Sequence, residues 1–157
     1  MNNNYLIVVG VDGSDGGRRA LEWASGEAAR RGGAVQAVIA WSWDGTEFGP
    51  FIATNPREAA ERARRVLDEE IAALVRRRGS SVPVAAEVIE GRPADVLAEA
   101  GKAGDLLVIG SHGHSRVRHT VLGSVSEDCI RKATCPVVVI PVPVRESGAP
   151  ADPVLRS

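Results

Sequence analysis

Short apolar runs alternate along the chain with longer amphipathic segments. Several of the runs are apolar at almost every position, as parallel strands covered by helices on both faces must be. The strands predicted from these runs are residues 5–11 (YLIVVGV), 34–40 (AVQAVIA) and 105–110 (DLLVIG). The run 82–90 (VPVAAEVIE) alternates more strongly, and Pro83 cannot donate to a ladder, so we predict an edge strand there. A last strand is predicted at 135–142 (CPVVVIPV).

Between these runs, apolar residues recur at three- and four-residue steps, which is the pattern of amphipathic helices. The clearest case is 57–78, which Gly79 follows as a stop signal. Ser124 and Glu127 have the spacing of a capping box, which places a helix start at Ser124. The predicted helices are 15–31, 57–78, a segment from Pro93 to about Gly101, and 124–133.

The elements follow one another in the order βαβαβαβαβ. This order predicts the α/β class, with a three-layer, doubly wound sheet of five mostly parallel strands and helices on both faces. We expect residues 1–143 to form a single domain. Residues 41–56 have no period and form a long loop, a type of segment that is often functional. The stretch 144–157 is rich in Pro, Ser and Gly and is expected to be a disordered tail.

The composition indicates a globular protein of moderate charge. The 157 residues are 44% hydrophobic and 25% charged, and the formal net charge is −1. This balance gives no overall electrostatic signal for nucleic acid or a membrane surface as a partner. Cys129 and Cys135 are too few for a disulfide framework, and we expect reduced thiols. The segment MNNNYLIVVG lacks the regions of a secretory signal, so the expected location is the cytoplasm.

Glycines punctuate the segment after the strand 105–110. Gly110 and Gly113 come directly after this strand, and Gly123 follows after nine intervening residues, immediately before Ser124 and a predicted helix. Glycine allows positive φ and close approach of the backbone to a ligand. A helix N-terminus offers unpaired amides and a positive dipole end. Because ligands of doubly wound sheets bind at the carboxyl ends of the strands, the spacing predicts a phosphate cradle. Basic side chains that add positive potential to it are His114, Arg116, Arg118 and His119.

The pattern Gly110-x2-Gly113-x9-Gly123-Ser124 resembles the ATP-binding signature of the universal stress protein family. Three further segments resemble the same family: IVVGVDGS at 7–14, GRPADVLAEA at 91–100 and LGSVSEDCIRKATCPVVVIP at 122–141. The resemblance covers roughly residues 4–142 and favours the branch of the family that binds ATP. It implies a fold like that of the adenine nucleotide alpha hydrolases, a dimer, and a regulatory role in the stress response.

The resemblance also implies which residues would hold ATP. Asp12 would lie near the ribose, Gly10 and Val11 near the base, and the backbone of Ala40 at the adenine edge. Residues 110–116 would hold the ribose and phosphates, and 124–126 the terminal phosphates. Mg²⁺ or Mn²⁺ would be held by the phosphates themselves. The implied residues are Gly10, Val11, Asp12, Ala40, Gly110, Ser111, His112, Gly113, His114, Ser115, Arg116, Gly123, Ser124, Val125 and Ser126.

Other functions remain open at this point. His112-x-His114 could be half of a metal site, although no third ligand is evident. Trp41 and Trp43 could stack on adenine, or could cover the end of the sheet. A slow ATPase or an ATP-dependent phosphotransferase is an alternative, but no nucleophile, base and orienting group are recognisable. A dimeric interaction module without a ligand is the second alternative.

The last predicted strand also bears on assembly. Residues 136–142 (PVVVIPV) carry no charge, and an apolar unpaired edge invites association with another chain. Pro141 and Pro143 would limit further pairing. We therefore expect a homodimer formed through this strand, together with a regulatory protein partner that the sequence does not identify.

Overall fold

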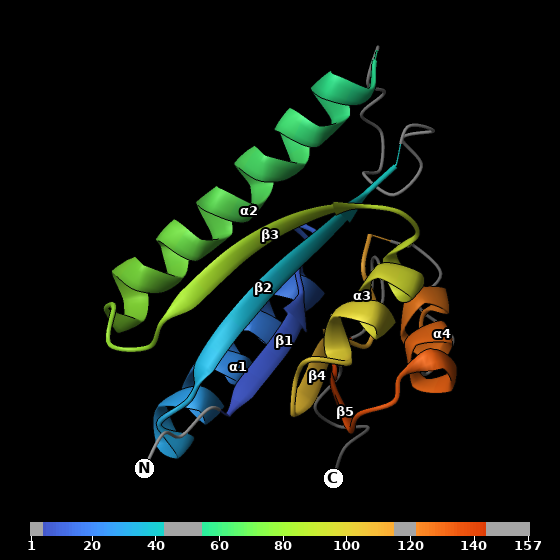
Figure 1. The fold of residues 1–157 in the computed structure, drawn as a ribbon. Coiled ribbons are helices and arrows are strands. Elements are labelled where there is room, and N and C mark those ends of the chain that lie inside the picture. The colour runs from blue at the N-terminus through green and yellow to red at the C-terminus, as the bar shows by residue number, and fades with distance from the viewer. Residues whose placement is uncertain (1–4, 43–54, 115–121, 144–157) are drawn as a thin grey trace, which may run out of the picture.

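A five-stranded sheet forms the centre of the protein (Figure 1). The computed structural model describes residues 5–42, 55–114 and 122–143. The strands lie in the order β3-β2-β1-β4-β5, and each neighbouring pair is parallel. The predicted fold class is therefore confirmed, and β3 is an edge strand as predicted. The strands are β1 (Leu6–Gly10), β2 (Ala34–Trp41), β3 (Val84–Glu90), β4 (Leu106–Gly110) and β5 (Val137–Ile140).

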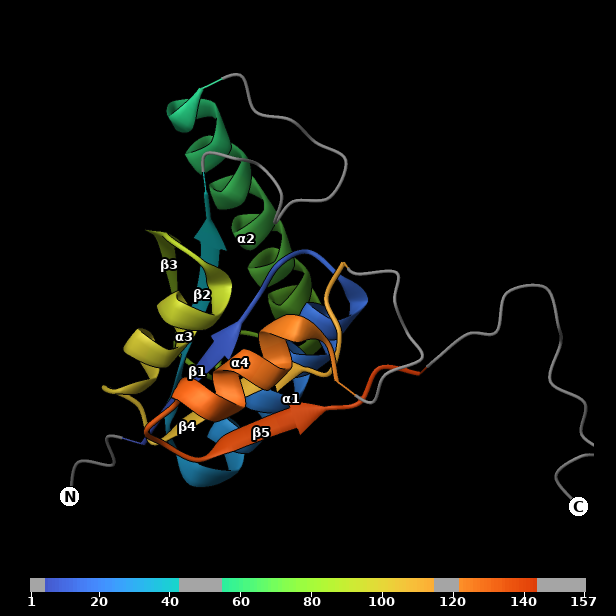
Figure 2. The ribbon, with the colours of Figure 1, turned by 90° about the vertical axis from the view of Figure 1, so that its right-hand side faces the viewer.

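Helices cover both faces of this sheet (Figures 1 and 2). One face carries α1 over β1 and β4, and α2 over β2 and β3. The opposite face carries α3 over β2 and β1, with α4 packed beside α3. The helices are α1 (Asp15–Arg31), α2 (Pro56–Arg78), α3 (Pro93–Gly101) and α4 (Ser124–Lys132).

The helices begin and end where local signals require. The hydroxyl of Ser14 accepts from the Gly17 amide and caps α1, and Gly32 ends that helix with φ of 65°. Asn55 caps α2 in the same way. At α4 the predicted capping box is wrong. Gly123 is the N-cap, Ser124 is the first helical residue, and no side chain caps this helix.

Side chains that alternate along each central strand build two separate cores. On β2, for example, Val35, Ala37 and Ile39 pack toward α1 and α2, whereas Val38 packs toward α3 and α4. Both faces of the strand are buried, which is why the run reads as apolar at nearly every position.

The strand order places the reversal of the chain between β1 and β4. The chain runs from β1 outward to β3 and then returns to the other side of β1. In doubly wound sheets, ligands bind outside the carboxyl ends of the strands at this switch point. Residues 43–54, which form most of the predicted loop, and the predicted tail 144–157 lie outside the described residues. No helix within the described ranges has the length and apolar character needed to cross a membrane.

Candidate functional site

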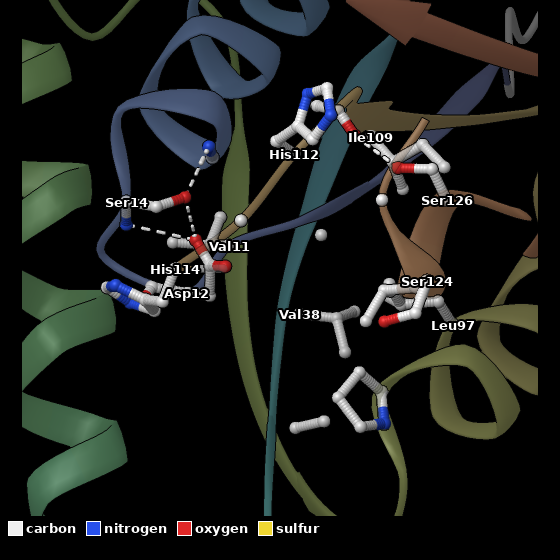
Figure 3. A pocket seen from close by; sticks show the side chains of 18 residues that line it. Val11, Asp12, Ser14, Val38, Leu97, Ile109, His112, His114, Ser124 and Ser126 are labelled. Carbon is white, nitrogen blue, oxygen red and sulfur yellow. Dashed lines mark hydrogen bonds between the residues drawn. The ribbon is translucent and has the colours of Figure 1, made fainter. Parts of the chain in front are cut away.

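A cavity of about 400 Å³ opens at the carboxyl ends of β1, β2 and β4 (Figure 3). This volume lies in the range of small-molecule sites. Most of the implied nucleotide residues meet there: Gly10, Val11, Asp12, Ala40, Gly110, His112, Gly113, His114, Gly123, Ser124, Val125 and Ser126 all line it. Ser115 and Arg116 lie outside the described residues, as do Arg118, His119 and Trp43.

One wall of the cavity is the turn between β1 and α1. The Oδ1 atom of Asp12 accepts from the backbone amide of Ser14 at 2.9 Å and also from the Ser14 hydroxyl. The Oδ2 atom lies beside Gly113. Ser14 therefore holds one carboxylate oxygen and orients the other along the loop that follows β4. An ionised carboxylate accepts hydrogen bonds only, so this wall favours a ligand with hydroxyl donors.

The opposite wall is the N-terminus of α4 (Figure 3). The Gly123 amide donates to the Ser111 carbonyl at 2.7 Å, but the first helical amides, those of Ser124, Val125 and Ser126, have no acceptor within the helix. Because no side chain of the described residues caps α4, its amides and positive dipole end remain available to an anion. The predicted capping box does not form, and this end of the helix is therefore suited to bind negative charge.

The backbone amide and carbonyl of Ala40 point into the space beyond the end of β1. The Val38 carbonyl accepts from the Val11 amide at 2.9 Å, so Val38 faces β1. Strand geometry has a period of two, so the Ala40 amide and carbonyl face the same side. The pairing of β1 with β2 ends at Gly10 and Val38, and the Ala40 backbone groups therefore extend beyond the partner strand. A flat heterocycle with a donor and an acceptor on one edge fits this position.

An apolar surface lies below these polar groups. It is formed by Val38, Ile109 and Leu97, and Pro93 stands at the start of α3. All of it belongs to the sheet face that α3 and α4 cover. Trp41 instead packs with the core on the other face and does not line the cavity. The alternative in which Trp41 covers the end of the sheet is thus the one that its position favours.

Contacts within the protein require Gly110 and Gly113 to lack a side chain, while the predicted close approach to a ligand stays a prediction. Positive φ was expected, but among the described glycines only Gly13, Gly32, Gly79 and Gly91 have it. A Cβ on Gly110 would lie 2.7 Å from the Gly16 carbonyl oxygen, because the first turn of α1 packs directly on β4. A Cβ on Gly113 would lie 2.6 Å from Oδ2 of Asp12. Gly110 therefore serves packing, and Gly113 makes room for the carboxylate.

Among the implied residues that the structure describes, Ser111 is the one that does not line the cavity. Its amide donates to the Ile140 carbonyl, and its hydroxyl accepts from the Val142 amide at 2.9 Å. Its carbonyl accepts from the Gly123 amide and from the Ser126 hydroxyl. Ser111 thus joins the end of β4 to β5 and to α4.

The two histidines of the loop have different surroundings. His112 is buried, with Nδ1 3.1 Å from the Ser111 hydroxyl. His114 is exposed, and its Nε2 donates to the Asp12 carbonyl. Across residues 5–42, 55–114 and 122–143, no three His, Cys, Asp or Glu side chains gather as a metal site would require.

Two buried titratable groups have shifted pKa values. Burial raises the pKa of the Cys129 thiol on α4 to about 11, so the thiol is protonated at neutral pH and packs as a small apolar group. Burial also raises the pKa of Glu70 on α2, and the charge of Arg18 on α1 opposes this shift in part.

Some cavity residues were not predicted from the sequence. Ser14 carried a usable signal, since a serine before a helix indicates a cap and hence a fixed position. Pro93 and Leu97 are four residues apart on α3, but only the tertiary packing places that helix face over the switch point. The residues that sequence reasoning missed are Ser14, Gly17, Val38, Pro93, Leu97 and Ile109.

The fold and this cavity define a doubly wound α/β protein with a ligand site at the switch point. The model of the universal stress protein family matches residues 6–141, and the chain belongs to that family. A universal stress protein of Mycobacterium tuberculosis is 35% identical over 151 residues, a match that covers 92% of this chain and 46% of the relative. One from Thermus aquaticus is 31% identical over 137 residues, covering 85% of this chain and 96% of the relative. The chain spans about half the length of the mycobacterial relatives that it matches.

Solved structures of the family superpose well on this chain. A universal stress protein of Archaeoglobus fulgidus, in complex with dAMP, gives a TM-score of 0.65 at 26% identity, covering 88% of this chain and 99% of the other. A universal stress protein in complex with cAMP gives a TM-score of 0.65 at 24% identity, covering 88% of this chain and 98% of the other. The second likeness bears on the fold alone.

Proposed function

We propose that this protein binds an adenine nucleotide, ATP, in the cavity at the switch point and acts as a regulatory protein of the stress response. The proposal rests chiefly on one observation: the Asp12 carboxylate faces the uncapped N-terminus of α4 across a single cavity. A hydroxyl-bearing sugar and a phosphate chain carry the complementary groups. The dAMP complex of the Archaeoglobus fulgidus relative supports an adenine nucleotide as the ligand.

The three parts of ATP have distinct partners in this proposal. Adenine lies on the apolar surface around Val38 and Leu97, with its edge bonded to the backbone of Ala40. The ribose hydroxyls donate to Oδ2 of Asp12. The phosphates lie against the amides of residues 124–126 and the hydroxyl of Ser124, where the helix dipole favours negative charge.

A divalent ion would accompany the phosphates. Mg²⁺ and Mn²⁺ prefer oxygen ligands, and Mg²⁺ is commonly held by substrate phosphates with few protein ligands. The Ser124 hydroxyl is the cavity side chain placed to add an oxygen near them. The ion would reduce the charge of the triphosphate and would not require a dedicated protein site.

We further propose that two copies associate through β5. The carbonyls of Pro136 and Ile140 accept from the amides of Leu107 and Ser111, so alternate residues, including Val139, direct their amides and carbonyls to the open edge. Antiparallel pairing of Val139 with its copy would satisfy these groups around a twofold axis. Pro141 lacks an amide, and its carbonyl accepts from Arg19, which would confine the pairing to a short segment.

Calorimetric titration with ATP and Mg²⁺ tests the nucleotide proposal. We expect a dissociation constant in the micromolar range, roughly 7–8 kcal/mol of binding free energy. Asp12→Ala removes the ribose acceptor and should abolish most of the heat. Absence of heat with the unaltered protein at millimolar ATP would refute nucleotide binding and would favour the interaction module without a ligand. Production of ADP at a steady rate would favour the ATPase alternative.

A further inference from the structure

A second hollow, of about 520 Å³, lies along the outer side of α1, on the other face of the sheet from the proposed nucleotide site. The basic side chains among the described residues that line it are all arginines. We call it the arginine groove, and its five arginines are Arg18, Arg19, Arg30, Arg77 and Arg78.

The floor of the groove is one face of α1. Arg18, Glu22, Gly26 and Arg30 follow at four-residue steps and therefore line up along the helix. The row extends for about 18 Å at the helical rise of about 1.5 Å per residue. Gly26 leaves a gap in the row, and the guanidinium of Arg78 from α2 lies over it, with Nη2 3.3 Å from where a Cβ would be.

Positive charge exceeds negative charge in the groove. Glu22 is the one acidic residue among the described residues that line it, and it pairs with Arg78 at 2.8 Å and with Arg77 at 3.2 Å. Arg18 lies 3.6 Å from Glu70, and Arg30 pairs with Glu27. The side chains of Arg18, Arg30, Arg77 and Arg78 nevertheless stay between 42% and 67% exposed. The pairs of Glu22 are exposed on both sides, and exposed ion pairs contribute about 0–1 kcal/mol, so an incoming carboxylate can replace them at little cost.

The groove also offers apolar contacts. Trp23 lines its floor, and Ile140 of β5 closes one side. Trp23 is partly buried against the core, so its position is fixed while part of the indole faces outward. A tryptophan beside arginines is a typical composition for the energetically dominant centre of a protein interface.

We propose that the arginine groove binds an acidic peptide segment of a partner protein, with an apolar side chain of that segment packed against Trp23 and Ile140. The planar guanidinium fork suits bidentate contact with carboxylates. The chain as a whole has a net charge of −1, which favours a short acidic peptide over a long polyanion such as nucleic acid. The inference goes beyond the nucleotide proposal and does not depend on it.

Fluorescence anisotropy with a labelled peptide tests this site. The probe is the heptapeptide Glu-Asp-Glu-Leu-Glu-Asp-Glu, blocked at both ends and used at about 50 mM salt, where screening is moderate. We expect saturable binding by the full chain without nucleotide, and at least tenfold weaker binding by the double variant Arg19→Glu, Arg30→Glu. Trp23→Ala should weaken this peptide but not one with Gly in place of Leu.

The matched control is the double variant Arg57→Glu, Arg64→Glu. It makes the same change of charge at α2 positions whose side chains are 89% and 51% exposed and do not line the groove. Unchanged binding by this control supports the groove. Equal losses of peptide affinity in both double variants would overturn the proposal. The proposal would also be overturned if the unaltered chain showed no saturable binding of the peptide, or if a dT heptamer bound more tightly and competed with the peptide. Circular dichroism checks folding, and Arg30→Ala replaces the double variant if that does not fold.

Discussion

Asp12 and Gly113 occupy adjacent space, and the position of one depends on the size of the other. The Ser14 amide and hydroxyl hold Oδ1 of Asp12, so the carboxylate has little freedom to move away from the loop. The absence of a side chain at Gly113 is what allows Oδ2 to lie beside the loop backbone. At this scale the candidate site is a contact between two turns that are a hundred residues apart in the chain.

Gly113→Val should therefore weaken ATP binding at least tenfold, which corresponds to about 1.4 kcal/mol. The new Cβ would displace Oδ2 of Asp12 and the bulk of valine would narrow the cavity. Calorimetry on the variant measures the change. Leu107→Ala is the control: it removes a fully buried side chain of β4 and should cost about 2–5 kcal/mol of stability while the folded protein still binds ATP. Normal ATP affinity in Gly113→Val would exclude this loop from the site.

Among the elements, α1 and α2 start in similar ways but differ in what their caps touch. Ser14 caps α1 and also orients Asp12, whereas Asn55 caps α2 and accepts from the Glu58 amide at 2.8 Å. Each cap accepts one backbone amide in the first turn of its helix. Asn55 does not line the cavity.

This difference gives a matched pair of variants. Ser14→Ala and Asn55→Ala should each lower stability by about 1 kcal/mol, or a melting temperature by about 2–4 °C. Ser14→Ala should also weaken ATP binding by about fivefold, because a hydrogen bond of about 1 kcal/mol no longer holds the carboxylate. Thermal melts and titrations of both variants provide the comparison. Equal effects on ATP affinity would mean that stability alone, and not the orientation of Asp12, controls binding.

For the whole molecule, the open edge of β5 determines how copies can meet. Val139→Lys should convert the proposed dimer to a monomer, since two ammonium groups would face each other near the axis. Val75→Lys makes the same replacement on α2, at a side chain already 38% exposed, and should remain dimeric. Light scattering at micromolar concentration is the measurement. A mass near 16.5 kDa for the unaltered chain, rather than about twice that value, would contradict the dimer.

Much of this architecture is predictable from local patterns. The apolar runs and helical periods give the order of elements, and Gly32, Gly79 and Pro93 mark boundaries close to where the structure places them. These signals act over a few residues and require no knowledge of the tertiary fold. The rules of doubly wound sheets then predict the fold class, but they allow more than one strand order, and the order β3-β2-β1-β4-β5 comes from the structure.

The parts that were not predictable depend on contacts between distant segments. Gly110 is required by the packing of α1 on β4, which no local pattern records. Ser124 has capping-box spacing, but spacing alone does not reveal that Gly123 is the N-cap and Ser124 is already the first helical residue. Leu97 reaches the cavity only because α3 crosses the switch point. Most of the polar and glycine residues of the site were thus predictable from the sequence. The apolar residues beneath them, and the contacts that hold them in place, were not.

Ser111 joins three elements through its amide, its hydroxyl and its carbonyl, and two of them carry the proposed binding events. The N-terminus of α4 would receive phosphates, and β5 would receive a second copy of the chain. We expect nucleotide occupancy and association of two copies to be coupled, because both would act on segments that Ser111 joins. Thermodynamic coupling is reciprocal, so whatever factor the nucleotide applies to the dimer's dissociation constant, assembly must apply to nucleotide affinity. Cellular concentration of the protein would thereby set its sensitivity to the nucleotide pool.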